Sequence, residues 1–203
     1  MREQKPQFNQ RHSLVVTLLP CGTVDASELG DLAQALRAKG MLVNIAHEKS
    51  IPARAFESRR QQYRADEFLK VARSEPGDRV LTVTNCDLYA DNLNFVFGLA
   101  SSFGKCAVIS LCRLRIAVDQ ETFRRRVAKE AVHELGHTLG LAHCAKPSCV
   151  MHFSNSLQDT DRKSCDWCER CQKKLQADPE PASSSKKRRL KYGYLGAKGT
   201  TAE

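Results

Sequence analysis

The sequence predicts an α/β fold in which a mixed, mostly parallel, twisted sheet packs against helices and is followed by a loop-rich C-terminal segment. Strand and helix signals alternate through the first half of the chain, which is typical of parallel strands joined by right-handed crossovers. Two closely spaced apolar runs follow, with no room for a helix between them. Five of the nine cysteines then fall within residues 144–171, where regular periodicity is lost.

Three β-rich runs, residues 14–19, 41–46 and 79–84, alternate with two amphipathic helices. In the first helix, Asp25 and Glu28 are spaced as a capping box. Apolar residues at helical spacing continue the first helix at Leu29, Leu32, Ala33 and Leu36, and define the second at Ala65, Phe68, Leu69 and Ala72. This order of elements predicts a parallel core.

The apolar runs at residues 94–99 and 106–114 are joined by a short Ser- and Gly-containing stretch, which predicts a hairpin and therefore a mixed sheet. Asp119 can cap a long helix whose apolar side chains keep helical spacing at Phe123, Val127, Val132, Leu135 and Leu139. We expect this helix to cross behind the sheet as its main packing partner, and a short helix near residues 169–175.

The distribution of charge and of apolar residues indicates a single domain with a basic tail. Of the net charge of +9, residues from Lys186 onward contribute six basic side chains against Glu203, so the excess lies in a tail. We expect one domain over residues 1–177, with subdomains 1–140 and 141–177, and a disordered basic tail over 178–203. No apolar run is long enough to span a bilayer, and we expect a cytoplasmic monomer without a membrane partner.

The most informative feature is the run that begins at His133 and Glu134, continues through His137 and Gly140, and ends at His143. Residues four apart on an α-helix share one face, so the first two histidines can bind one ion. The carboxylate of Glu134 would then accept a proton from a zinc-bound water molecule. Gly140 permits the positive φ that turns the chain back and brings in His143 as third ligand.

An HExxH pattern by itself also arises by chance on amphipathic helices. Here three of the six histidines of the chain stand at metal-ligand offsets, with a glycine between the second and the third. We therefore predict a catalytic zinc site. Its fourth coordination position stays open, which separates a catalytic zinc site from a structural one.

The clustered cysteines predict a second metal site. Cys144 and Cys149 form one pair, and Cys168 and Cys171 form another, with spacings suited to a tetrahedral zinc site of four thiolates. Disulfides are the alternative, but they do not persist in a reducing compartment. Cys165 stands three residues before Cys168, so spacing alone leaves the choice of four among five thiols open. The other four cysteines are expected to be small buried hydrophobes.

These stretches resemble the archaemetzincins, a family within the metzincin group of zinc peptidases. The resemblance covers about residues 14–175 and is carried by HELGHTLGLAHCAKPSCVM, HFSNSLQDTDRKSCDWCERC, DLYADNLNFVFGLA and AVISLCRLR. It implies a compact metzincin-like domain with an active-site helix, a C-terminal subdomain held by a four-cysteine zinc site, and hydrolysis of peptide bonds.

The resemblance also implies a role for each matching residue. His133, His137 and His143 would bind the catalytic zinc ion, with Glu134 as general base and acid. Met151 would be the Met-turn residue, packing beneath the metal site. A second, structural zinc ion would be bound by Cys144, Cys149, Cys168 and Cys171, with Cys165 outside the pattern.

Three functions are compatible with these features. Zinc-dependent peptide hydrolysis leads, with a peptide or protein as substrate and two zinc ions as cofactors. The alternative is a binding module of little or no activity on the same scaffold, but the intact Glu134 argues against it. Nucleic-acid binding through the tail is disfavoured because no aromatic stacking pattern accompanies the charge. The strand at residues 94–99 could hold an extended peptide at a sheet edge or be an ordinary buried strand; substrate-binding residues and cleavage specificity stay open.

Overall fold

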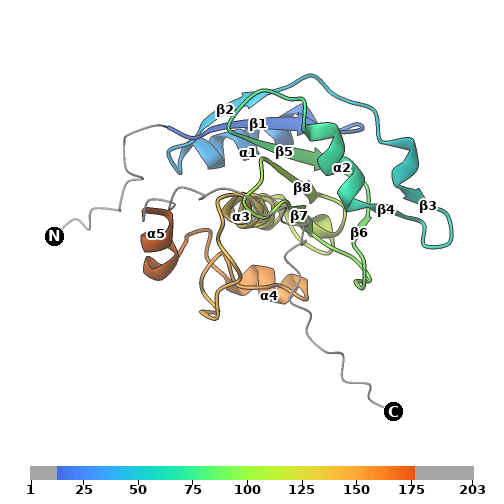
Figure 1. Ribbon diagram of the computed structural model, residues 1–203. Helices are drawn as coiled ribbons and strands as arrows, with labels where there is room; N and C mark the ends of the chain where they lie inside the picture. The colour runs from blue at the N-terminus through green and yellow to red at the C-terminus, as the bar shows by residue number, and fades with distance from the viewer. Residues whose placement is uncertain (1–12, 177–203) are drawn as a thin grey trace, which may run out of the picture.

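The core of the computed structural model, which describes residues 13–176, is a five-stranded sheet in the order β2-β1-β5-β8-β7 (Figure 1). The first four strands are parallel, and β7 pairs antiparallel with β8. The strands span Val15–Pro20 (β1), Leu42–Ile45 (β2), Arg79–Thr84 (β5), Gly98–Ala100 (β7) and Cys106–Ser110 (β8). The predicted mixed, mostly parallel sheet is confirmed.

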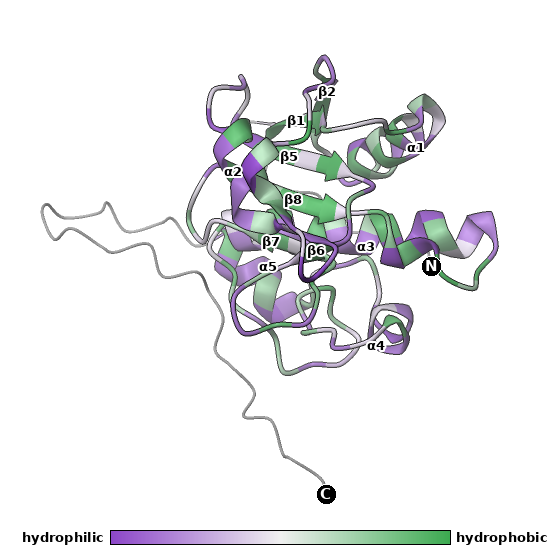
Figure 2. Cartoon of the chain, turned by 90° about the vertical axis from the view of Figure 1, so that its right-hand side faces the viewer, coloured by the Kyte–Doolittle hydropathy of each residue, from purple (hydrophilic) through white to green (hydrophobic). Residues whose placement is uncertain are grey.

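Helices cover both faces of the sheet. Figure 2 shows α2 (Ala65–Ala72) on one face, and α1 (Ala26–Arg37) with α3 (Gln120–Thr138) on the other. Asp25 caps α1 by accepting the Ser27 N–H at 2.7 Å, but Glu28 pairs with Arg115 at 2.6 Å rather than completing the predicted capping box. The caps and the apolar spacing therefore predicted the helices correctly. Glu28 does not cap α1, because it pairs with Arg115, which is distant in sequence.

Neighbouring residues of one strand pack into two different hydrophobic clusters, one on each face of the sheet, because side chains alternate across a sheet. Leu18 and Leu81 pack with α1 and α3, whereas Leu19 and Val80 pack with α2. All four side chains have no exposed surface. Burial on both faces explains why the central strands read as continuous apolar runs in the sequence.

A second sheet was not predicted. It has the order β3-β4-β6 and consists of short strands at Phe56–Glu57, Gln62–Arg64 and Leu88–Tyr89. Its strands are only two or three residues long, too short to show an alternating pattern.

The predicted strand at residues 94–99 is mostly irregular, and only its end belongs to β7. Val96 donates its N–H to the Leu88 carbonyl of β6 at 2.8 Å, while the Phe97 carbonyl accepts the Ser110 N–H of β8 at 2.8 Å. The two halves thus bond to different sheets, which interrupts the ladder. In the run 106–114, β8 ends at Ser110 and a 3₁₀ turn follows at Arg113–Arg115.

The C-terminal segment lies beside α3 and carries two short helices, α4 (Leu157–Arg162) and α5 (Glu169–Gln176) (Figure 1). The helix expected near residues 169–175 is confirmed. The helix α4 was not predicted, although Ser156 and Asp159 form a full capping box at its start. The expected tail over 178–203 lies outside the described residues. Within residues 13–176, every helix is too short or too polar to cross a membrane.

A close contact joins this segment to α3. Met151 and Trp167 pack against the helix at Gly136, where a side-chain methyl group would collide with the Met151 sulfur and lie 3.0 Å from Trp167 Nε1. Met151 is fully buried, and Trp167 is 9% exposed. Glycine is therefore required at this position for the segment to approach α3.

We predict that Gly136→Ala lowers the free energy of unfolding by about 1–3 kcal/mol, since the added methyl overpacks a buried contact. Gly30→Ala is the matched control, because nothing lies within 4 Å of a methyl group there on α1. The control should be neutral or should stabilise the protein by up to about 1 kcal/mol. Urea denaturation of both variants measures the difference, and equal stabilities would contradict the prediction.

Candidate active site and metal centres

The helix α3 presents His133 and His137 side by side, with their Nε2 atoms 3.1 Å apart. The Nδ1 atom of His133 is 2.7 Å from the Val150 carbonyl, and that of His137 is 2.7 Å from the Leu141 carbonyl. A carbonyl can only accept, so each Nδ1 carries the proton. Each Nε2 is then left with its lone pair toward the space between the rings, as a metal ligand requires.

The chain reverses directly after these histidines. Gly140 has a φ of 91°, as its place in the sequence predicted, and its N–H donates to the His137 carbonyl at 3.0 Å. Leu141 donates to the Gly136 carbonyl at 2.9 Å, which completes a Schellman motif. This turn brings the His143 ring centroid to 4.8 Å from that of His137.

The three histidines fit a zinc ion. One nitrogen of each lies within 4.8 Å of the others. Tetrahedral zinc with nitrogen at 2.0–2.1 Å needs ligand atoms about 3.3 Å apart, near the 3.1 Å between His133 and His137. Burial lowers the pKa of His133 and of His137. Although His143 is exposed, burial of part of its ring and the neighbouring His137 lower its pKa to about 4. All three are therefore neutral near pH 7, the form that binds metal.

Glu134 lies next to the first histidine and is 5% exposed. Burial and the neighbouring charge of Glu130 raise its pKa well above the usual range, and Lys163 opposes the shift. A cation held by the histidines would favour the ionised carboxylate. Its side chain lies against the backbone of β7, because a methyl group added at Gly98 would stand 2.7 Å from Glu134 Oε1.

Glu130 is one turn before Glu134 and forms a buried ion pair with Lys163, at 2.9 Å. Lys163 has no exposed surface, and its ammonium also donates to the His152 carbonyl at 3.5 Å. Thr160 donates to the same Glu130 carboxylate at 3.3 Å. The pair therefore prevents two unpaired carboxylates from facing one cleft.

Four cysteines of the C-terminal segment come together in a cluster, with their sulfur atoms all within 4.8 Å of one another. They are Cys144, Cys149, Cys168 and Cys171. The separations are 3.8 Å for both Cys144–Cys168 and Cys149–Cys171. Tetrahedral zinc with sulfur at about 2.3 Å requires about 3.8 Å. This donor set fits zinc, and Cys165 stands outside it.

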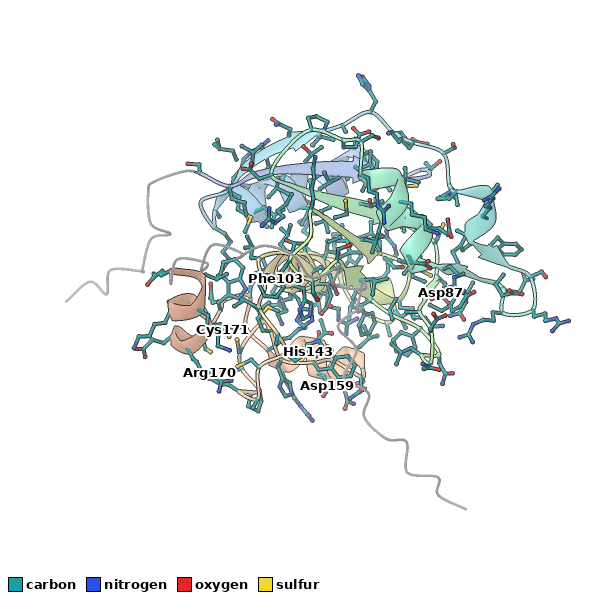
Figure 3. The ribbon with its side chains drawn as sticks, viewed as in Figure 1. Asp87, Phe103, His143, Asp159, Arg170 and Cys171 are labelled. Carbon is teal, nitrogen blue, oxygen red and sulfur yellow. The ribbon has the colours of Figure 1, made fainter. Side chains whose placement is uncertain are left out.

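A guanidinium lies beside this cysteine cluster and favours the thiolate form of Cys144. Arg170 donates to Cys144 Sγ at 3.3 Å. Burial acts to raise the pKa of Cys144, but the Lys146 N–H and the bonds from Arg170 and Cys168 lower it to about 6. Burial raises the pKa of Cys149 and Cys171 within the cluster, and also that of Cys165 outside it. Figure 3 shows Arg170 and Cys171 together at the start of α5, away from His143.

A cleft runs past the histidines. Its lining comes from residues 93–100 around β7, from Glu130, His133, Glu134 and His137 of α3, and from Ser102, His143 and residues 153–155. Met151 lies behind this lining, fully buried against α3. The structure thus brings Glu134 and the three histidines to one cleft and gathers the four cysteines into a separate cluster.

Several residues of the site were missed in the sequence. Glu130 could have been noticed from its spacing of four from Glu134, and Arg170 from its place between two cysteines. Gly98 and Lys163 carry no local signal, because their partners on α3 are more than 30 residues away. Only the folded chain shows what these two residues contact.

Comparison with known proteins agrees with this geometry. Residues 36–177 match the model of peptidase family M54. The archaemetzincin of Methanocaldococcus jannaschii is 42% identical over 166 residues, covering 79% of this chain and 92% of the relative. That of Halobacterium salinarum is 39% identical over 168 residues, covering 78% of this chain and 97% of the relative.

Solved structures show the same architecture. The crystal structure of archaemetzincin from Methanopyrus kandleri superposes with a TM-score of 0.73 at 39% identity, covering 83% of this chain and 97% of that one. The archaemetzincin of Archaeoglobus fulgidus, complexed with malonate, gives 0.72 at 39% identity and covers 79% and 99%. This chain therefore belongs to peptidase family M54, the archaemetzincin family of zinc metallopeptidases.

Proposed function

We propose that His133, His137 and His143 hold the catalytic zinc ion of this peptidase and that Glu134 is its general base. The observation that carries this proposal is the convergence of three neutral imidazoles, two of them fixed by carbonyl acceptors, beside a buried carboxylate in the wall of a cleft. The bound zinc ion would acidify a water molecule and polarise the scissile carbonyl.

Other residues around the proposed zinc site have distinct roles in the reaction. Glu134 accepts the proton of the attacking water and delivers it to the leaving amine. Gly98 leaves room for the carboxylate between α3 and β7. The Lys163–Glu130 ion pair keeps Glu134 as the one unpaired carboxylate among the cleft residues of α3.

A structural zinc ion at the four cysteines is the second part of the proposal. Cys144 directly follows His143, and its N–H donates to the Met151 carbonyl at 2.9 Å. Val150, next to Met151, in turn orients His133 through its carbonyl. Closing the cysteine site would therefore hold the segment that carries Met151 against α3, as proposed for a Met-turn.

The substrate is a peptide or protein, as the family implies. We propose that it binds extended along β7, which among residues 13–176 pairs on one side only, with β8, and whose residues line the cleft. We also propose that residues 1–177 form one domain that acts as a monomer in the cytoplasm. Support comes from a core that runs from Val16 to Cys171 and from free thiols suited to a reducing compartment.

Glu134→Gln should keep both zinc ions and lower kcat by about 10²–10⁴-fold, because the amide cannot accept the proton. Glu121→Gln is the matched control, since Glu121 lies on the same helix and is 79% exposed. Peptide-library cleavage followed by mass spectrometry, with metal analysis of each variant, provides the measurement. Full activity in Glu134→Gln would refute the assignment.

Cys171→Ser should reduce the zinc content from about two ions to about one, because a structural site needs all four ligands. Cys165→Ser should retain both ions, since Cys165 lies outside the cluster. Elemental analysis of the purified variants tests this. The opposite pattern would mean that Cys165 is the ligand.

Gly98→Ala should lower kcat by about ten- to a hundred-fold with zinc content and stability preserved. The three atoms nearest to the added methyl all belong to the Glu134 side chain, so we expect the carboxylate to move while the fold stays. Steady-state kinetics and thermal unfolding separate the two effects. Unchanged kcat, or a large loss of stability, would show that Gly98 does not position the base.

A further inference from the structure

The small sheet β3-β4-β6 contacts the cleft through its side chains. Arg60, in the turn between β3 and β4, donates from Nη2 to the carbonyls of Leu93 and Asn94, at 3.1 and 2.9 Å. Its guanidinium also lies 4.4 Å from the ring centroid of Tyr89 in β6. Both carbonyls belong to residues 93–97, which line the cleft and are called the cleft wall below.

Gln62 of β4 connects Arg60 to the same backbone. It accepts from Arg60 Nε at 3.1 Å, and its amide donates to the Asn94 carbonyl at 3.0 Å and to Asp87 at 3.1 Å. Gln62 is 7% exposed. A buried amide with three partners has one favourable orientation, so it holds Arg60 and Asn94 in register.

Asp87 extends the network to Phe95, the next residue of the cleft wall. Arg113 binds its carboxylate with two bonds, of 2.6 and 2.8 Å, and the same guanidinium lies 4.3 Å from the ring centroid of Phe95. Figure 3 shows Asp87 on the side of the molecule that carries the small sheet. The cleft wall is thus held at the Leu93 and Asn94 backbone and at the Phe95 ring.

Regular strand pairing does not hold this segment. Within residues 93–97, Val96 makes a single bridge to Leu88, and β7 begins only at Gly98. Backbone bonds to other strands reach only its second half, at Val96 and Phe97. The position of residues 93–95 therefore depends on the side-chain contacts from Arg60, Gln62 and Arg113.

The cleft wall is mostly apolar, and Asn94 is the one polar residue among residues 93–97. Leu93, Phe95 and Phe97 line the cleft, and the two phenylalanine rings meet edge to face at 5.2 Å. Acidic side chains in the lining are limited to Glu130, paired with Lys163, and Glu134. This wall offers a peptide dispersion contacts and desolvation rather than charge pairing.

We propose that Arg60 and Gln62, together with the Asp87–Arg113 pair, are positioning residues that hold the cleft wall to receive an apolar side chain of the peptide substrate. The inference rests on the proposed active site in this cleft. The network bonds to the backbone and one ring of the wall and includes none of the three histidines or Glu134. Loosening it should therefore weaken substrate binding without altering the catalytic step.

The test uses the zinc-loaded full chain and four quenched fluorescent peptides that differ only in the residue beside the cleaved bond, which is Phe, Leu, Ser or Asp. Arg60→Gln is compared with Arg59→Gln, which removes the same charge from the same turn. Arg59 is exposed, as Arg60 is, and its backbone N–H donates to the Glu57 carboxylate at 3.2 Å. Arg60→Lys keeps the charge but cannot bridge both carbonyls and Gln62.

Wild-type enzyme should prefer Phe and Leu. Arg60→Gln should raise KM for these two peptides by about five- to ten-fold, with kcat within about two-fold, and Arg60→Lys should lie between. Arg59→Gln should match the wild type. The proposal is overturned if Arg60→Gln and Arg60→Lys behave like Arg59→Gln, if kcat falls instead of KM rising, or if all four peptides lose affinity equally. Failure of the active-site assignment shows separately, as activity retained in Glu134→Gln.

Discussion

The turn at Gly140, where α3 stops and the chain reverses, places the third histidine and the first cysteine in consecutive positions. Its positive φ and its two backbone bonds to α3 set the direction in which the chain leaves the helix. His143 is thereby brought to the two helical histidines, and Cys144 starts the thiol cluster. The segment that returns with Met151 closes the loop by accepting from the Cys144 N–H. Neither donor set would assemble if this turn took another path.

The site also requires that the charges of its buried side chains be balanced. The cleft holds two carboxylates on one helix face, and burying both unpaired would carry a large desolvation cost. Lys163, fully buried at the end of α4, pairs with Glu130, so that only Glu134 is left unpaired for the role of general base that we propose. Arg170 contacts the cysteine cluster through Cys144 and lowers the pKa of that thiol. Each metal site therefore has a nearby cation supplied by the C-terminal segment.

The small sheet β3-β4-β6, at the periphery of the molecule, contacts residues that line the cleft. Its strands are too short to hold together as an isolated unit, and they are stabilised by bonds such as that of Gln62 to Asn94 and Asp87. The same bonds fix an irregular segment that lines the cleft. The small sheet thus shapes the cleft in which we propose that the substrate binds.

The sequence by itself determined the parallel strands of the main sheet, the helices α1, α2 and α3, and which histidines share a face, because apolar periodicity, caps and the i, i+4 spacing are local properties of the chain. It placed the strand before β8 at residues 94–99, of which only the end belongs to β7. It left open the choice between Cys165 and Cys171, which the same spacing allowed, and it gave no sign of β3, β4 and β6. Tertiary structure decided these points, along with the partners of Gly98 and Lys163. Each is a contact between segments distant in sequence, and only packing brings such segments together.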